Sequence, residues 1–393
     1  MSVPAASEMP EIPEIPEIHG QVDEQFEPVR RAFAKNFAER GEVGAAVCVY
    51  RHGRPVVDLW AGVADRANAT PWERDTIVTV FSMSKGVTAI AINLLIERGL
   101  LDPDAPVARY WPEFAAAGKD RITVGLALSH QAGIPVVDRP LTRAETLSWD
   151  PVIDAIAAQR PIWEPGTQHG YHMRTYGWIA GELIRRVTGR TAGRFIREEI
   201  AEPFAVDFHI GLDERHEMRV APLVTPGSEY HTAIAGLPAD LLLTRVISAP
   251  SGHFHYDDMW NTRELRAVEL PSSNGVGNAR AVARLYTHLI SDGVDGRRIF
   301  SDDTVAHATK VRARGTDAVI LVDTAFGIGF MLPPALPTPV GPRSFGHGGA
   351  GGSMSFADPD AGIAFAYAMN KMRFDMDDGR AESLARAVYR SLE

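Results

Sequence analysis

The stretch Phe81-Ser82-Met83-Ser84-Lys85-Gly86 opens the segment that decides the fold. Residues 87–96, which follow it, are apolar almost all the way round a helix, and this pattern predicts a buried central helix. Ser82 and Lys85 are three residues apart, so a helix places them one above the other on the same face. A lysine in such a buried position is either charged and paired, or neutral and able to act as a base.

The Ser82–Lys85 pair has two interpretations. It is either an activated serine nucleophile of the S-x-x-K type or a helix-capping serine beside a solvated lysine. A chain of this length and average composition contains roughly one such spacing by chance, so the spacing alone favours the cap. None of the other lysines has a serine three residues upstream. The pair is unique in the chain, and it stands where a buried helix begins.

Bulk composition narrows the class of protein. The 393 residues exceed the size at which one hydrophobic core stops growing, which predicts two structural units. The net charge of −10 argues against a nucleic-acid partner and does not favour an anionic membrane surface. Cys48 is the only cysteine, which excludes an intramolecular disulfide, and its apolar neighbours predict a core position. The sequence shows neither a membrane-spanning apolar run nor a secretion signal, so we expect a cytoplasmic protein without a membrane partner.

Strand patterns begin near the start of the chain. Residues 1–19 are expected to be a tail, in which Pro-Glu-Ile is repeated three times and favours extended backbone. Residues 20–40 carry apolar side chains at helical spacing and predict an amphipathic helix. The runs 44–51 and 55–61 predict a hairpin that turns at His52-Gly53.

Helical patterns fill the middle of the chain, and strand patterns return near its end. The later strand-like runs are 318–322, 326–332, 344–348, 353–357 and 363–369, followed by a closing helix over 380–392. This order predicts an α/β (α+β) fold with an antiparallel sheet flanked by helices. Residues 20–81 and 315–393 would form the discontinuous α/β domain, and residues 82–314 a mostly helical second domain. The cleft between them is the expected active site.

Four segments, in order, carry a resemblance to a known family. They are Phe81-Ser82-Met83-Ser84-Lys85, Leu128-Ser129-His130-Gln131-Ala132-Gly133, Pro165-Gly166 followed by Tyr171, and Gly346-His347-Gly348-Gly349. From about residue 22 to the end, the chain resembles the serine β-lactamase and penicillin-binding-protein superfamily. Within it, the chain is similar to the class C-like esterases called family VIII carboxylesterases. S-x-x-K alone is a weak signal, whereas four signals in order are a strong one.

The resemblance implies a mechanism of acyl transfer through a serine. Ser82 attacks an acyl carbon, and it needs a base to take its hydroxyl proton near neutral pH. Lys85 and Tyr171 are the implied acid/base pair, and either a neutral lysine or a tyrosine phenolate could accept the proton. By the same resemblance, Tyr171 protonates the leaving alcohol and activates water for deacylation. The alternative for Tyr171 is an aromatic side chain that anchors the following helix.

The segment His347-Gly348-Gly349 occupies the family's Lys-Thr-Gly position. Its glycines let a substrate approach the backbone, so these three residues, with Met173, are the implied substrate-binding residues. The backbone N–H groups of Ser82 and Ala350 are the implied oxyanion hole, and such donors are worth roughly 3–4 kcal/mol each. His347 departs from the family's lysine, and Met173 stands where β-lactamases have the asparagine of Tyr-x-Asn. A neutral ester needs neither group, so these departures favour an esterase over a β-lactamase or peptidase.

Three other motifs and one histidine are discounted. Gly346-x-Gly348-x-x-Gly351 matches a dinucleotide fingerprint, but a strand rather than a helix is expected after it. The chain has no G-x-S-x-G nucleophile elbow. Residues 253–258 contain metal-ligating types without a companion cluster, and we expect a loop whose aromatic residues line the pocket. His130 is expected to bond a neighbouring loop rather than to act in catalysis.

We therefore expect a carboxylesterase that hydrolyses small, short-chain acyl esters through a Ser82 acyl-enzyme, without a cofactor or metal. The alternatives at the same acyl-enzyme are acyl transfer to an alcohol or amine and amide or weak β-lactam hydrolysis. An alternative of a different class is a non-catalytic scaffold, which the intact Ser82, Lys85 and Tyr171 disfavour. The expected partner is a small-molecule ester, and the sequence makes no prediction of the oligomeric state.

Overall fold

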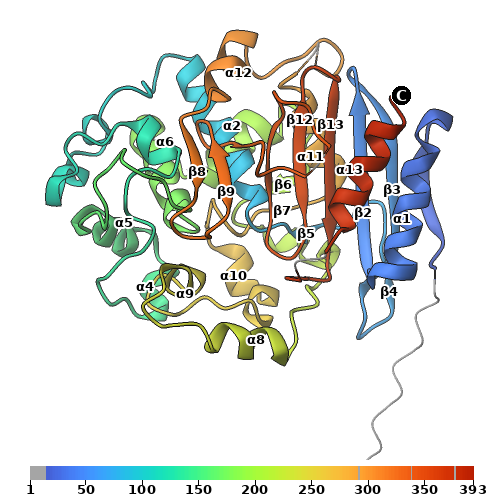
Figure 1. Ribbon diagram of the computed structural model, residues 1–393, viewed down its shortest axis with the longest axis horizontal. Helices are drawn as coiled ribbons and strands as arrows, with labels where there is room; N and C mark the ends of the chain where they lie inside the picture. Colours follow the sequence, from blue (N-terminus) through green and yellow to red (C-terminus); the bar gives the residue numbers. More distant parts are fainter. Residues whose placement is uncertain (1–14, 291–292, 338, 376–377) are drawn as a thin grey trace, which may run out of the picture.

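A ten-stranded antiparallel sheet forms the centre of the computed structural model, which describes residues 15–290, 293–337, 339–375 and 378–393. The strand order is β1-β3-β2-β13-β12-β11-β10-β9-β8, with β4 beside β3 (Figure 1). The strands along this order are β1 (Ile18–Val22), β3 (Arg54–Asp65), β2 (Gly44–Arg51), β13 (Ile363–Met369), β12 (Met354–Asp358), β11 (Phe345–Gly348), β10 (Met331–Leu332), β9 (Asp323–Phe326), β8 (Ala313–Thr316) and β4 (Thr70–Pro71). A small second sheet joins β5 (Val78–Thr79), β7 (Val276–Gly277) and β6 (Phe208–His209). The expected antiparallel sheet is confirmed.

The helices flank this sheet and fill the middle of the chain. They are α1 (Glu27–Arg40), α2 (Met83–Glu97), α3 (Val124–Leu128), α4 (Arg143–Thr146), α5 (Trp149–Ala158), α6 (Thr175–Thr188), α7 (Ala192–Ile196), α8 (Ser228–Ala235), α9 (Leu242–Ile247), α10 (Arg263–Ala267), α11 (Ala279–Thr287), α12 (Asp302–Ala308) and α13 (Arg380–Arg390). A π-helical turn over Arg197–Ala201 continues α7. The fold thus combines one large sheet with a helical region on one side of it, as Figure 1 shows.

Strand β13 shows how the sheet separates two cores. Its side chains alternate, because successive residues of a strand point to opposite faces. The large ones, such as Phe365 and Tyr367, pack with α1 and α13, whereas Ala364, Ala366 and Ala368 face the opposite core. The alanines leave room for α11, which packs across β13 and β2. Cys48 on β2 lies in that second core, as expected.

Helix α2 is the buried central helix that the sequence predicts. Every residue from Met83 to Leu95 is buried, and the chain leaves the helix through Gly99, which has a left-handed φ of +66°. A helix that is apolar all round gains its stability from packing on every side rather than from one amphipathic face. The surrounding packing therefore fixes the orientation of its N-terminus, where Ser82 lies.

Three expected elements are wrong at their boundaries or in type. Val22, expected in a helix over 20–40, lies in β1, and α1 begins only at Glu27. The run 318–322, expected as a strand, forms a turn, because the Asp317 side chain accepts the N–H groups of Val319 and Ile320 and offers the backbone an alternative to a strand. The expected strand 326–332 is interrupted around Gly327 and Gly329, which leaves β10 with two residues.

The other expected strands and the closing helix are found close to their predicted places. Strands β11, β12 and β13 match 344–348, 353–357 and 363–369 within a residue at each end. Of the expected tail, residues 1–14 lie outside the described residues, and Ile18 and His19 belong to β1. The division into a discontinuous α/β domain and a helical domain over 82–314 stays a prediction.

Candidate active site

Ser82 is the N-cap residue of α2, at the end of a strained turn. Phe81, directly before it, has a left-handed φ of 47°, which is costly for a bulky side chain and concentrates at functional sites. The Ser84 side chain holds this turn, because its hydroxyl donates to the Phe81 carbonyl and accepts the N–H of Gly275 at 2.8 Å. The helix start therefore presents Ser82 in one fixed orientation.

Lys85 is fully buried one turn inside α2. Its Nζ lies 3.0 Å from Ser82 Oγ and donates to the Ser272 carbonyl at 3.0 Å. Burial holds the pKa of Lys85 well below its ordinary value, and the nearby positive charge of Arg174 lowers that pKa further. Among the described residues, no carboxylate forms an ion pair with Lys85 or with the buried Arg174. Both effects favour the neutral form of the amine, which lies beside the Ser82 hydroxyl.

Tyr171 completes a close group with Ser82 and Lys85. Lys85 Nζ lies 4.8 Å from the centroid of the Tyr171 ring. Burial raises the pKa of the Tyr171 phenol well above its ordinary value, and the Ser82 hydroxyl partly opposes this rise. The phenol therefore keeps its proton near pH 7. The structure thus brings together all three residues that the sequence singled out for catalysis.

The backbone around Tyr171 is fixed on both sides by His130. The Gly170 N–H donates to the His130 carbonyl at 3.0 Å, and the His172 N–H donates to His130 Nδ1 at 3.1 Å. His130 is fully buried, and burial holds its pKa well below the ordinary histidine value. The expectation that His130 bonds a neighbouring loop is confirmed.

Asp317 is a supporting residue that the sequence analysis missed. Its Oδ1 accepts the Tyr171 N–H at 3.0 Å, and the same oxygen accepts the N–H groups of Val319 and Ile320. An aspartate at the start of an apolar run is a typical turn signal, and it could have indicated this turn. Ser272 was also missed, and it could not have been found, because it contributes only its backbone carbonyl to Lys85.

The turn after β11 lies directly against the chain that leads into Ser82. The Gly349 N–H donates to the Ser353 carbonyl at 2.8 Å, and the Ser353 hydroxyl donates to the Val80 carbonyl at 3.1 Å. A Cβ atom on Gly349 would lie 2.3 Å from the same carbonyl oxygen, so only glycine allows this approach. Within the described residues, the backbone N–H groups of Ser82 and Ala350 have no hydrogen-bond acceptor.

His347 and Met173 lie beside Tyr171. The His347 ring is fully buried, and its centroid is 6.0 Å from that of Tyr171. Burial and the Lys85 side chain lower the pKa of His347 to about 3, so this side chain is neutral near pH 7. Its Nδ1 lies 2.7 Å from the Gly348 carbonyl. The half-buried Met173 has its sulfur 3.9 Å from the Tyr256 hydroxyl, so neither side chain provides a cation.

Aromatic side chains surround Phe81. The ring of Tyr256 is 5.4 Å from that of Phe81 and 5.0 Å from that of Phe374. Tyr256 comes from segment 253–258, whose aromatics we expected near the pocket, while His253 Nε2 lies 2.8 Å from the Leu141 carbonyl. The part of the chain that the structure describes holds no group of three His, Cys, Asp or Glu side chains suited to a metal.

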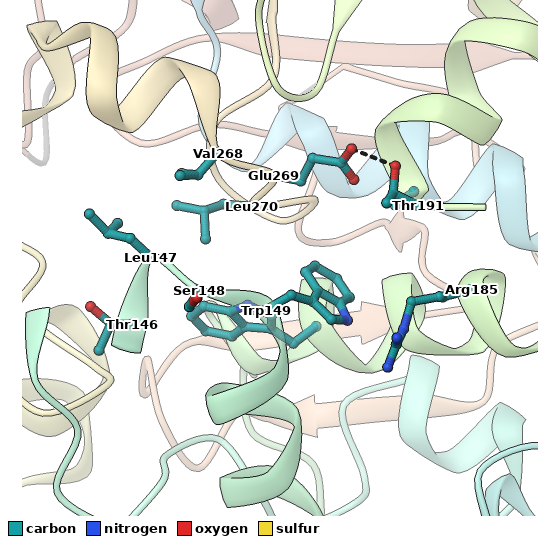
Figure 2. A pocket seen from close by; sticks show the side chains of 11 residues that line it. Thr146, Leu147, Ser148, Trp149, Arg185, Thr191, Val268, Glu269 and Leu270 are labelled. Atoms are coloured by element: carbon teal, nitrogen blue, oxygen red, sulfur yellow. Dashed lines mark hydrogen bonds between the residues drawn. The ribbon is translucent and has the colours of Figure 1, made fainter. Parts of the chain in front are cut away.

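A separate pocket of about 220 Å³ lies beside α5 and α6 (Figure 2). Trp149, Trp178 and Leu270 give it a largely apolar lining. Glu269, at one end, accepts a hydrogen bond from the Thr191 hydroxyl. None of the predicted site residues lines this pocket, so it is distinct from the Ser82 site.

Comparison with known proteins agrees with this geometry. The family model described as Beta-lactamase matches residues 29–390. The chain belongs to the β-lactamase family. It is therefore a serine hydrolase by family.

Individual relatives place the chain near the esterases of this family. It is 37% identical over 368 residues to the Esterase/beta-lactamase LipL of Mycobacterium tuberculosis, over 90% of this chain and 83% of the relative. A crystal structure of a family VIII carboxylesterase shares 38% identity and a TM-score of 0.86, covering 95% of this chain and all of the other. A penicillin-binding protein homologue from Caulobacter crescentus gives the same identity, TM-score and coverage. The resemblance to family VIII carboxylesterases is confirmed.

None of the helices in the described residues has the length and apolar character needed to cross a membrane.

Proposed function

We propose that the protein is a carboxylesterase that hydrolyses small, short-chain esters through an acyl-enzyme on Ser82. The observation that carries this proposal is the contact between Ser82 Oγ and the buried Lys85 Nζ, 3.0 Å apart. Lys85 has no carboxylate partner in the described residues, and its lowered pKa favours a neutral amine that can act as a base within reach of the hydroxyl.

In acylation, Ser82 Oγ attacks the ester carbonyl carbon and passes its proton to Lys85 Nζ. The carbonyl oxygen becomes an oxyanion, and the free N–H groups of Ser82 and Ala350 are the donors suited to stabilise it. When the tetrahedral intermediate breaks down, Tyr171 gives its phenolic proton to the leaving alkoxide and recovers a proton from the Lys85 ammonium. This sequence leaves both side chains neutral again, with the acyl group on Ser82 and the alcohol released.

Deacylation reverses these roles with water as the nucleophile. Tyr171 and Lys85 share the proton taken from water, and the same two N–H groups stabilise the second oxyanion. The proton finally returns to Ser82 Oγ as the carboxylic acid leaves. No step requires a cofactor or a metal, because every proton moves among Ser82, Lys85 and Tyr171.

Two observations favour a neutral ester over a β-lactam as the substrate. His347 is neutral and buried, so it gives no cation at the position of the family's lysine. Met173 cannot donate the hydrogen bonds of an asparagine amide. A β-lactam carries a carboxylate and an amide that need such partners, whereas a small ester does not. The relative named Esterase/beta-lactamase keeps weak β-lactam hydrolysis as the second candidate.

The deciding experiment compares hydrolysis of p-nitrophenyl butyrate by the wild-type protein, by Ser82→Ala and by Ser228→Ala. Ser228 is an exposed serine at the start of α8 and serves as the matched control. We expect activity in the wild type and in Ser228→Ala, none in Ser82→Ala, and a butyryl group on the Ser82 peptide by mass spectrometry. Equal activity in Ser82→Ala and wild type would exclude this mechanism.

Further arms of the same experiment separate the alternatives. Added alcohol or amine acceptors that speed turnover of the acyl-enzyme would indicate acyl transfer. Faster turnover of nitrocefin than of the ester would favour a β-lactamase. Absence of any label on Ser82 with a reactive phosphonate would favour the non-catalytic scaffold.

A further inference from the structure

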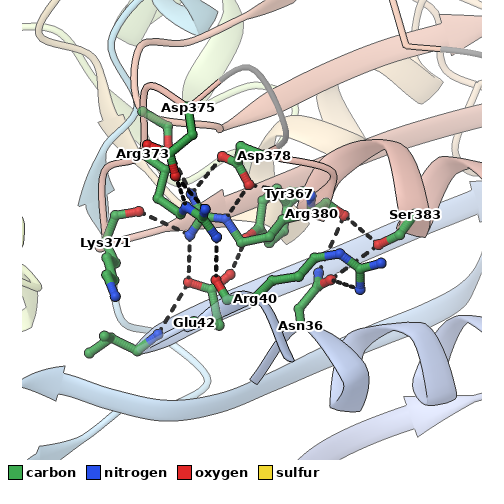
Figure 3. A network of polar contacts seen from close by, with 12 residues as sticks. Asn36, Arg40, Glu42, Tyr367, Lys371, Arg373, Asp375, Asp378, Arg380 and Ser383 are labelled. Atoms are coloured by element: carbon green, nitrogen blue, oxygen red, sulfur yellow. Dashed lines mark hydrogen bonds and ion pairs between the residues drawn. The ribbon is translucent and has the colours of Figure 1, made fainter. Parts of the chain in front are cut away.

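A buried ion-pair cluster (Figure 3) is hydrogen-bonded to the turn that follows β11. Its centre is Arg380, the first residue of α13, which is fully buried. All five N–H groups of the guanidinium donate hydrogen bonds, at 2.7 to 3.0 Å. The acceptors are the carboxylates of Asp378 and Glu42 and the backbone carbonyls of Lys371 and Gly351. Because every donor is used, the orientation of the guanidinium plane is fixed.

The contact with Gly351 is important because Gly351 directly follows Ala350, whose N–H belongs to the proposed oxyanion hole. Arg380 Nη2 donates to the Gly351 carbonyl at 2.9 Å, and the Arg373 N–H donates to the same oxygen at 3.0 Å. On the other side of Ala350, the Gly349 N–H is bonded to the Ser353 carbonyl. Ala350 is thus held between two fixed peptide groups, and both together set the direction of its N–H.

The turn packs on the guanidinium with no side chain between them. Gly351 and Gly352 have left-handed φ values of +84° and +121°. A Cβ atom on Gly352 would lie 2.8 Å from an Asp378 carboxylate oxygen and 2.9 Å from Arg380 Nη2. A shift of the guanidinium is therefore passed directly to the backbone of the turn.

We propose that Arg380 is a positioning residue for the oxyanion hole, which aligns the Ala350 N–H with Ser82 through the Gly351 carbonyl. This inference rests on the proposed function, in which that N–H stabilises the oxyanion. Lysine cannot replace Arg380 in this role. A single ammonium group cannot reach Asp378, Glu42 and Gly351 in one planar arrangement.

The test compares Arg380→Lys with Glu42→Gln. The first keeps the positive charge but loses the planar contact with Gly351. The second weakens the same buried cluster and leaves the Gly351 contact in place, so it controls for stability. The readouts are kcat and KM for p-nitrophenyl butyrate and the inhibition constant of butylboronic acid. A boronic acid forms a tetrahedral adduct on the serine and places an oxygen in the oxyanion hole.

For Arg380→Lys we expect kcat to fall about 10-fold or more with KM nearly unchanged, because complete removal of one oxyanion donor costs about 10²–10³-fold in kcat. Boronic acid inhibition should weaken in parallel. Glu42→Gln should lower the melting temperature and change both readouts less than twofold. A folded Arg380→Lys protein with unchanged kcat and inhibition overturns the proposal. Equal losses in both variants also overturn it, because the effect would then follow stability.

A second variant covers the case in which Arg380→Lys does not fold. Gly352→Ala keeps every charge and inserts a methyl group against Asp378 and Arg380, so the same two readouts should fall. Unchanged readouts there would overturn the proposal. Arg280→Lys, which weakens a bidentate ion pair with Asp58 elsewhere, should leave both readouts unchanged.

The wild-type protein separates the two proposals. If it neither hydrolyses the ester nor binds the boronic acid, the proposed function itself is overturned. If it is active and Arg380→Lys has the same kcat and inhibition constant, only this inference is overturned.

Discussion

Lys85 and Arg380 are both fully buried basic side chains, and their surroundings differ in every respect. Arg380 is bonded to two carboxylates and two carbonyls, so its charge is matched and all of its donors are used. Lys85 has one carbonyl acceptor, the Ser82 hydroxyl and a positive neighbour, Arg174. The partners of Arg380 therefore keep it charged, whereas burial without a counter-ion favours the neutral form of Lys85.

The difference shows how one fold keeps one buried basic side chain charged and favours the neutral form of another. A guanidinium does not lose its proton in proteins, and its fixed donors suit a rigid cluster. An amine responds to desolvation, so burial without a counter-ion converts it into a proton acceptor. The partners, and not burial alone, decide the role of each residue.

The largest effect is expected when a guanidinium replaces the amine of Lys85, the proposed base. Lys85→Arg keeps a basic side chain but cannot accept the Ser82 proton. We expect kcat/KM for p-nitrophenyl butyrate to fall about 10²–10⁴-fold, the range of a lost general base. Steady-state kinetics on the purified, folded variant measures this. Retention of a tenth or more of the activity would show that Lys85 is not the base.

The converse change removes the charge from the structural cluster. Arg380→Met leaves Glu42 and Asp378 buried or half-buried without their cation, and we expect the free energy of unfolding to fall by about 3–5 kcal/mol. Urea denaturation followed by fluorescence measures the loss. A fall of less than about 1 kcal/mol would mean that the carboxylates find other partners or become protonated.

Lys85→Met tests whether the pKa of Lys85 is lowered in the folded protein. Because the folded-state pKa of Lys85 lies below its unfolded value, the unfolded chain binds an extra proton between the two. Lys85 therefore destabilises the wild type most at low pH, and this effect disappears as pH rises toward the ordinary lysine pKa of about 10.4. The stability of Lys85→Met relative to wild type should thus decrease with rising pH. A difference that is independent of pH would contradict a neutral Lys85.

A smaller effect is expected when the positive neighbour is removed. Arg174→Gln should raise the pKa of Lys85, because the Arg174 charge lowers it. The acidic limb of the kcat/KM profile should then move to higher pH. Arg245→Gln, which removes an exposed ion pair with Asp138, is the control and should leave the profile in place. A shift of the limb to lower pH would contradict the electrostatic role of Arg174.

The smallest effect concerns His347. Its pKa is about 3, so it stays neutral across the working range and cannot contribute a limb to the pH profile. His347→Gln should therefore keep the shape of the profile between pH 5 and 8, whatever its effect on the absolute rate. Loss of a limb near pH 6 in this variant would show that His347 titrates there.

The sequence predicted those parts of the molecule that depend on local pattern. The hairpin at His52-Gly53, the alternating strand 363–369 and the buried helix after Ser82 each carry their signal within a few residues, and each was found. The strand predicted for the apolar run 318–322 was wrong. The Asp317 side chain accepts backbone N–H groups there, which stabilises a turn in place of a strand.

The supporting parts of the site could not be predicted in the same way. Ser272 acts through a carbonyl that every residue possesses, and Arg380 meets Gly351 only after the chain has folded. The resemblance to a family singled out Ser82, Lys85 and Tyr171, which the structure places close together. The contacts that hold those residues in place depend on long-range packing, for which single residues leave no local pattern.

The pairing of β2 with β13 has a consequence for the order of events during synthesis. Glu42 and Arg380, which meet beside this pairing, are 338 residues apart. A growing chain contains Ser82, Lys85 and Tyr171 long before β11 to β13 leave the ribosome, so the proposed nucleophile is present early but the turn opposite it is not. Contacts between such distant segments form slowly. The helices that are synthesised early therefore cannot complete their packing until the last strands have joined the sheet. Nascent chains halted before β13 should therefore contain every proton-transfer group and still be unable to turn over an ester.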